Sequence, residues 1–175
     1  VEIQLIDDEG QVINEPDTPG ELYARSVALF DTYYKAEEKY LEDHLGGFQT
    51  VGDIAYKDTD GYFYICDRKK DMIITGGVNV YPAEIENVLD EHPKVHEVAV
   101  VGVADEEWGE VVSAIVVRNG ECSAEELIEF AREHLSGPKT PKIVLFVDEL
   151  PKTGSGKVLK RELRDRVDLH IQSEA

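Results

Sequence analysis

Two valine-rich stretches decide the fold of the second half of the chain: VHEVAVVGV at residues 95–103 and VVSAIVVR at residues 111–118. β-Branched residues that recur with a period close to two favour strands over helices. The sequence therefore predicts two strands of one small sheet here.

Helices and a third strand surround this pair. Pro82 is a natural first helical residue, and a helix is expected from there to about residue 92. Ser123 and Glu126 form a capping box that starts a second helix, which Gly137-Pro138 ends. A strand at residues 142–147 and a helix at residues 159–167 with a loose tail complete the pattern. This order predicts an α+β fold with a three-stranded sheet and flanking helices.

The first 66 residues are rich in turns and strands instead. Strands are expected at residues 1–6, 20–26, 48–56 and 62–65, with a helix at residues 33–43. Asp60-Gly61 between the last two strands is a strong hairpin signal. The chain opens on a strand at Val1 with no Met before it, which suggests that it was cut from a longer polypeptide.

Composition narrows the class of protein. The chain has 175 residues, 42% of them hydrophobic, and a net charge of −19. It is long enough to bury a core, has no apolar run that could span a bilayer, and is too acidic for non-specific binding to nucleic acid or anionic membrane. Two cysteines, Cys66 and Cys122, do not make a disulfide framework and predict reduced thiols in the cytoplasm.

A lysine on a glycine-rich loop is the first candidate for chemistry. The stretch LPKTGSGK at residues 150–157 resembles a phosphate-binding P-loop, but Pro151 and Val158 occupy two positions that the motif needs. What remains is Lys157 just before a helix, where it could reach a phosphate or carboxylate brought by another domain. Taken alone, the motif favours a solvated surface lysine over a functional one.

Two further groups have both a functional and a plain structural interpretation. Asp53 and Arg68 flank the hairpin, where they could bind sugar hydroxyls or form an ordinary salt bridge. Gly76 and Gly77 allow close approach of a ligand or simply a tight turn. The five histidines show no metal-ligand spacing, so no metal site is expected.

Together, these motifs in this order resemble the adenylate-forming superfamily, which includes acyl-CoA synthetases, peptide-synthetase adenylation domains and luciferases. The resemblance covers nearly the whole chain, and the sequences that carry it are Gly52-Asp53, DRKKDMII at residues 67–74, GGVNVYPAEIE at residues 76–86, residues 102–109 and residues 150–163. The form of residues 76–79 looks most like the acyl-CoA or aryl-CoA ligase branch.

The resemblance implies an activity and an organisation. Family members join ATP, with Mg²⁺, to a carboxylate, and a thiol, usually of CoA, then displaces AMP. Residues 1–69 would be the strand-rich, β-barrel-like end of a large N-terminal domain. Residues 70–175 would be the small C-terminal domain that moves between two poses, one for each half-reaction.

The resemblance also assigns roles to single residues. Lys157 matches the catalytic lysine of adenylation, which suits a cation placed between two anions. The other matches are the ribose-binding Asp53 and Arg68, the hinge residue Lys70, Gly76 and Gly77 of the pantetheine tunnel, and Lys139 and Trp108 near CoA.

Departures and alternatives remain. Val51 and Phe48 stand where the family usually has Thr and Trp. The phosphate loop and acid pocket would lie upstream, in a missing N-terminal domain, so the chain alone is expected to be inactive. An adenylation module of a peptide-synthetase-like assembly and a free-standing α+β regulatory or binding module stay open. The aliphatic residues between 67 and 82 favour a fatty acid as substrate.

Overall fold

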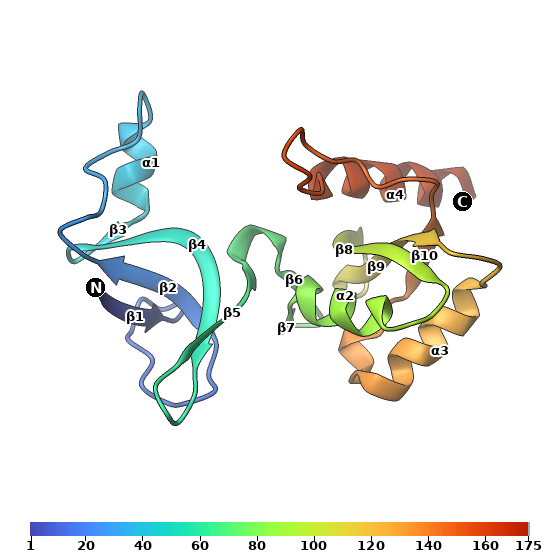
Figure 1. Ribbon diagram of the computed structural model, residues 1–175, viewed down its shortest axis with the longest axis horizontal. Helices are drawn as coiled ribbons and strands as arrows, with labels where there is room; N and C mark the ends of the chain where they lie inside the picture. Colours follow the sequence, from blue (N-terminus) through green and yellow to red (C-terminus); the bar gives the residue numbers. More distant parts are fainter. Residues whose placement is uncertain (175) are drawn as a thin grey trace. The chain divides into compact units, whose positions relative to one another are not determined.

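The computed structural model describes the backbone of residues 1–174 and the side chains of residues 1–168. The chain divides into two compact units, Val1–Lys70 and Asp71–Ala175 (Figure 1). No helix among the described residues is both long and apolar enough to cross a membrane.

The first unit is an antiparallel sheet in the order β1-β2-β4-β3, with β5 paired to β4. The turn between β4 and β5 forms because the Asp58 carboxylate accepts hydrogen bonds from the backbone N–H groups of Asp60 and Tyr62. Gly61 there adopts φ +89°, which glycine tolerates. The elements are β1 (Glu2–Ile6), β2 (Gly20–Arg25), α1 (Glu37–Glu42), β3 (His44–Leu45), β4 (Phe48–Lys57) and β5 (Phe63–Arg68), followed by the 3₁₀ turn η1 (Lys69–Asp71).

The second unit is the expected α+β fold, built on the two valine-rich strands. These strands pair antiparallel, and β10 joins the second of them in parallel, across the connection through α3. The elements are β6 (Ile73–Thr75), β7 (Val78–Val80), α2 (Pro82–Asp90), β8 (Val95–Asp105), β9 (Gly109–Arg118), α3 (Ala124–His134), η2 (Gly137–Lys139), β10 (Ile143–Phe146) and α4 (Lys160–Glu174).

Two details of this unit differ from the sequence prediction. The sheet has five strands rather than three, because residues 73–80 form the β6–β7 hairpin, whose three-residue strands are too short to show a period. The last helix continues to Glu174, so the expected loose tail was wrong over residues 168–174.

The helices cover both faces of this sheet (Figure 1). Alternate residues of a strand point to opposite faces. Val100 packs with α2 and α3 in one buried cluster, whereas its neighbour Val101 packs with α4 in another. Burial on both faces explains why valine occurs at consecutive positions of β8 and β9.

Candidate functional site

Asp53 and Arg68 lie directly opposite each other on β4 and β5. The Nε atom of Arg68 is 2.9 Å from Oδ1 of Asp53, and its Nη1 atom donates a hydrogen bond to the carbonyl of Val51. Gly52 adopts φ +77°, which a residue with a side chain rarely does. The structure therefore brings this pair together, with the Asp53 side chain 23% and the Arg68 side chain 50% exposed.

Lys157 lies on a closed loop at the start of α4. The N–H of Thr153 donates to the carbonyl of Lys157, whose own N–H donates to Oγ1 of Thr153. Leu159 closes the loop by donating to the carbonyl of Pro151. Among the described residues, no ion pair involves the Lys157 ammonium group, which is exposed. The backbone is thus fixed while the cation stays available.

Gly76 and Gly77 form the turn between β6 and β7. The N–H of Gly76 donates to the carbonyl of Trp108 at 2.9 Å, and a Cβ atom added to Gly76 would lie 2.9 Å from Cε3 of Trp108. Glycine is therefore required at 76 by a close approach, and both glycines have left-handed backbone angles. The structure joins the turn and Trp108 into one feature.

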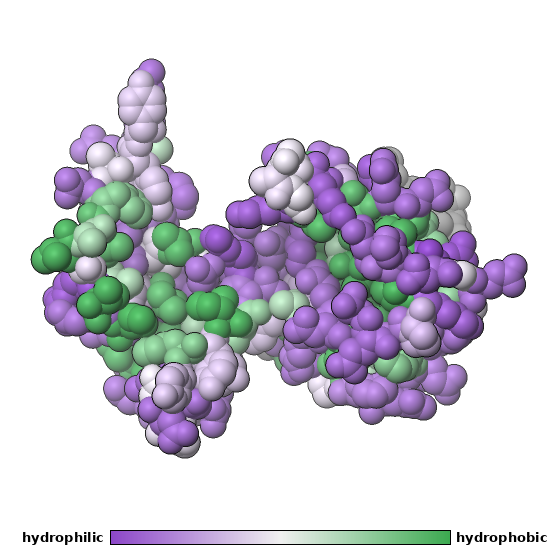
Figure 2. Space-filling model, in the orientation of Figure 1, coloured by the Kyte–Doolittle hydropathy of each residue, from purple (hydrophilic) through white to green (hydrophobic). Residues whose placement is uncertain are grey.

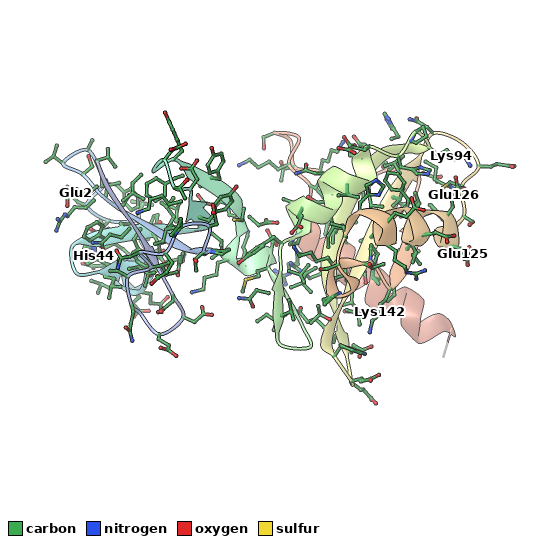
Figure 3. The ribbon with its side chains drawn as sticks, turned by 90° about the horizontal axis from the view of Figure 1, so that it is seen from below. Glu2, His44, Lys94, Glu125, Glu126 and Lys142 are labelled. Atoms are coloured by element: carbon green, nitrogen blue, oxygen red, sulfur yellow. The ribbon has the colours of Figure 1, made fainter. Side chains whose placement is uncertain are left out.

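Lys142 completes this feature and was missed at the sequence level. Its Nζ atom lies 4.0 Å from the centre of the Trp108 ring, within cation–π range, and Figure 3 shows its side chain. The available signal was its position only three residues beyond Lys139 on the same loop.

Lys139 and Lys70 have different surroundings. Lys139, in η2, forms an ion pair with Glu84 of α2 at 2.7 Å, so a phosphate would have to compete with that carboxylate. Lys70 lies in η1 at the boundary between the units.

The described residues contain no group of three or more His, Cys, Asp or Glu side chains that could hold a metal ion. His92 is buried and lies 3.6 Å from Glu126, while the side chain of His170 falls outside the described residues. Cys66 and Cys122 form no disulfide within the described part of the chain, and burial raises the pKa of the Cys122 thiol.

Comparison with known proteins extends this description. A family model described as the AMP-binding enzyme C-terminal domain matches residues 84–157. The 2-succinylbenzoate–CoA ligase of Bacillus mycoides is 42% identical over 165 residues, which are 94% of this chain and 34% of that protein. The chain spans about a third of the length of the curated relatives it matches.

Solved structures of CoA ligases are also similar to this chain. The o-succinylbenzoate CoA synthetase of Bacillus subtilis, in complex with its acyl-adenylate, matches with a TM-score of 0.87 and 37% identity over 93% of this chain and 33% of that one. A fatty acyl CoA synthetase of Mycobacterium tuberculosis matches with a TM-score of 0.64 and 40% identity over 94% and 33% of the two chains. The chain is the C-terminal portion of a member of the adenylate-forming ligase superfamily.

Proposed function

We propose that the chain supplies the C-terminal part of an ATP-dependent acid–CoA ligase. The enzyme would join a carboxylate to ATP as an acyl-adenylate with release of pyrophosphate, and would then transfer the acyl group to the thiol of CoA with release of AMP. The observation that carries this proposal is the exposed Lys157, which forms no ion pair with any described residue and lies on a loop closed by hydrogen bonds.

The first half-reaction brings two anions together, because a carboxylate attacks the α-phosphate of ATP. A cation placed between them lowers the barrier electrostatically, and we assign this role to Lys157. Asp53 and Arg68 would hold the ribose, with the carboxylate accepting and the guanidinium donating hydrogen bonds. Mg²⁺ would arrive with ATP, and we assign it no ligand in this chain.

The second half-reaction needs a narrow passage for the thiol of CoA. We assign its lining to Gly76, Gly77 and Trp108, because the turn and the ring are already in contact. Lys139 would attract a phosphate group of CoA once Glu84 releases it. Lys70 would act as the hinge between the two poses.

An aryl acid is the better candidate substrate than a fatty acid. The aliphatic residues that favoured a fatty acid include Ile73 and Val80, which are 1% and 0% exposed in the core of the second unit and are therefore needed for packing. The name of the similar Bacillus mycoides ligase specifies an aromatic dicarboxylic acid.

The longer polypeptide that contains these residues tests the proposal. It would be incubated in turn with 2-succinylbenzoate, benzoate and palmitate in the presence of ATP, Mg²⁺ and CoA, and AMP and acyl-CoA would be measured. We expect both products with an aryl acid. Thioester formation with palmitate alone would overturn the substrate, and acylation only of a carrier protein would favour the peptide-synthetase alternative.

The 175-residue chain is the matched control in this assay. We expect no turnover from it, and robust thioester formation would contradict the division of labour proposed here. Absence of AMP formation by the longer polypeptide with every acid would favour the regulatory-module alternative. A cytoplasmic location is part of the proposal, and fractionation of the source cells would check it.

A further inference from the structure

The residue before Lys70 is fixed to the first unit. Lys69 places its Nζ atom 2.8 Å from Oε2 of Glu21 on β2. The Glu21 side chain is only 13% exposed, and its other oxygen accepts a hydrogen bond from Oγ1 of Thr50 on β4. Lys69 is thereby connected to the centre of the sheet.

The residue after Lys70 is fixed to the second unit. The Nη2 atom of Arg164 donates to Oδ1 of Asp71 at 2.9 Å, across 93 residues of sequence. The Asp71 side chain is 13% exposed. Arg164 is rigidly held, because its neighbour Leu163 and the residue Val167 are both fully buried on the sheet.

Helix α4, which carries Arg164, begins three residues after Lys157. One turn before Arg164, Lys160 forms a second ion pair with Glu86 of α2 at 2.9 Å. Helix α4 therefore connects the Lys157 loop to the first residue of the second unit through a short, well-packed path.

Lys70 itself takes part in no ion pair within the part of the chain that the structure describes. We propose that the Lys69–Glu21 and Asp71–Arg164 ion pairs confine rotation between the units to Lys70, and that Arg164 is a positioning residue for Lys157. The proposal rests on the proposed function, in which Lys157 must reach one defined place in one of two poses. Without the second tether, rotation spreads over several bonds and the lysine arrives displaced.

Measurement of adenylation alone, in the longer polypeptide, tests this role. Arg164→Gln should lower kcat for acyl-adenylate formation by about 10- to 100-fold, since a displacement of about 1 Å can cost that much. KM for ATP should stay within about twofold, because the ATP-binding residues are untouched. The charge-reversed pair Asp71→Arg with Arg164→Asp should recover most of the rate, whereas a residue needed only for packing would show no such rescue.

Lys94→Gln is the matched control, since it breaks an ion pair of the same unit, with Glu126, that touches neither η1 nor α4. It should leave kcat unchanged. An unchanged kcat in Arg164→Gln would overturn the proposal. So would a decrease in kcat that merely parallels the decrease in melting temperature in both variants. A wild type without activity would instead reject the proposed function.

Digestion of the longer polypeptide by trypsin tests the Asp71–Arg164 tether without an activity measurement. Arg164→Gln should accelerate cleavage after Lys70 several-fold relative to wild type and to Lys94→Gln, because a released segment opens more often. Equal cleavage rates in the three proteins would overturn the tether. If Arg164→Gln fails to fold, Glu21→Gln tests the other tether by the rate of cleavage after Lys69.

Discussion

The second unit contains 21 of the buried apolar side chains among the described residues, whereas the first contains five. Both buried clusters lie wholly in the second unit. The first unit instead exposes large apolar side chains, and Figure 2 shows them as green areas. They include Val27, Leu41, Val51 and Ile65.

This difference separates a self-contained domain from a sheet that lacks a cover. Contiguous exposed apolar surface marks a place where another protein surface binds. In the proposed enzyme, the rest of a large N-terminal domain would supply that surface. The second unit has a core of its own, which agrees with the change of pose proposed for it.

Separation of the two units should show the largest effect. We expect residues 71–175 alone to unfold cooperatively, because their core is complete, and residues 1–70 alone to give no cooperative transition. Circular dichroism during thermal unfolding measures both. A cooperative transition in the isolated first unit would contradict the comparison.

Truncation of one buried side chain should come next. Leu163→Ala removes a fully buried contact between α4 and the sheet and should cost about 2–5 kcal/mol of unfolding free energy. Ile65→Ala, at a position 59% exposed in the first unit, should change it by less than about 0.5 kcal/mol. Urea unfolding followed by fluorescence of Trp108, the single tryptophan, reports on the second unit. Equal changes in unfolding free energy for Leu163→Ala and Ile65→Ala would show that the buried clusters do not stabilise the second unit.

The turn at Gly76 should give an intermediate effect. Gly76→Ala combines a left-handed backbone angle with the close approach of Trp108, and about 1–3 kcal/mol of destabilisation is expected. Gly77→Ala has a similar angle but open space, so it should cost less. In a Trp108→Ala background, Gly76→Ala and Gly77→Ala should lower the unfolding free energy by similar amounts, as measured by circular dichroism. A persistent difference would rule out the ring as its cause.

Acid should produce the smallest effect. The hydrogen bond from Lys94 lowers the pKa of Glu126, and Figure 3 shows the two side chains close together. A lowered carboxyl pKa adds stability above the ordinary pKa, and this stability is lost as pH falls through the folded value. Glu126→Gln should therefore flatten the pH dependence of unfolding between roughly pH 5 and 3.

Glu2 supplies the control for this acid effect. Its pKa is also lowered, by a hydrogen bond from Arg25, but it lies in the first unit. Glu2→Gln should leave the Trp108-monitored transition unchanged over the same range. Identical pH slopes for wild type and Glu126→Gln would contradict the assigned role.

Sequence reasoning was most successful where a pattern is long. The period of β8 and β9 and the capping box at Ser123 predicted their elements, and the Ser123 side chain does accept a hydrogen bond from the N–H of Glu126. The β6–β7 hairpin was missed as strands because three residues cannot show a period. The length of α4 was underestimated because most of its residues are polar or charged, a composition that is also typical of an exposed tail.

The candidate site divides in the same way. Asp53 and Arg68 could be paired from the hairpin, since its turn sets which residues face each other. The contacts of Lys142 with Trp108 and of Arg164 with Asp71 could not be predicted, because they join elements far apart in sequence. Such contacts depend on tertiary packing, which local periodicity does not contain.

The role of Lys157 is tested most directly by separating the two half-reactions in the longer polypeptide. For Lys157→Gln we expect acyl-adenylate formation to fall by about 10²- to 10³-fold, as for loss of one electrostatic group at a reacting centre. Transfer to CoA from supplied acyl-adenylate should stay within a few-fold of wild type. An unchanged first step, or equal loss in both steps, would contradict the assignment of Lys157 to adenylation.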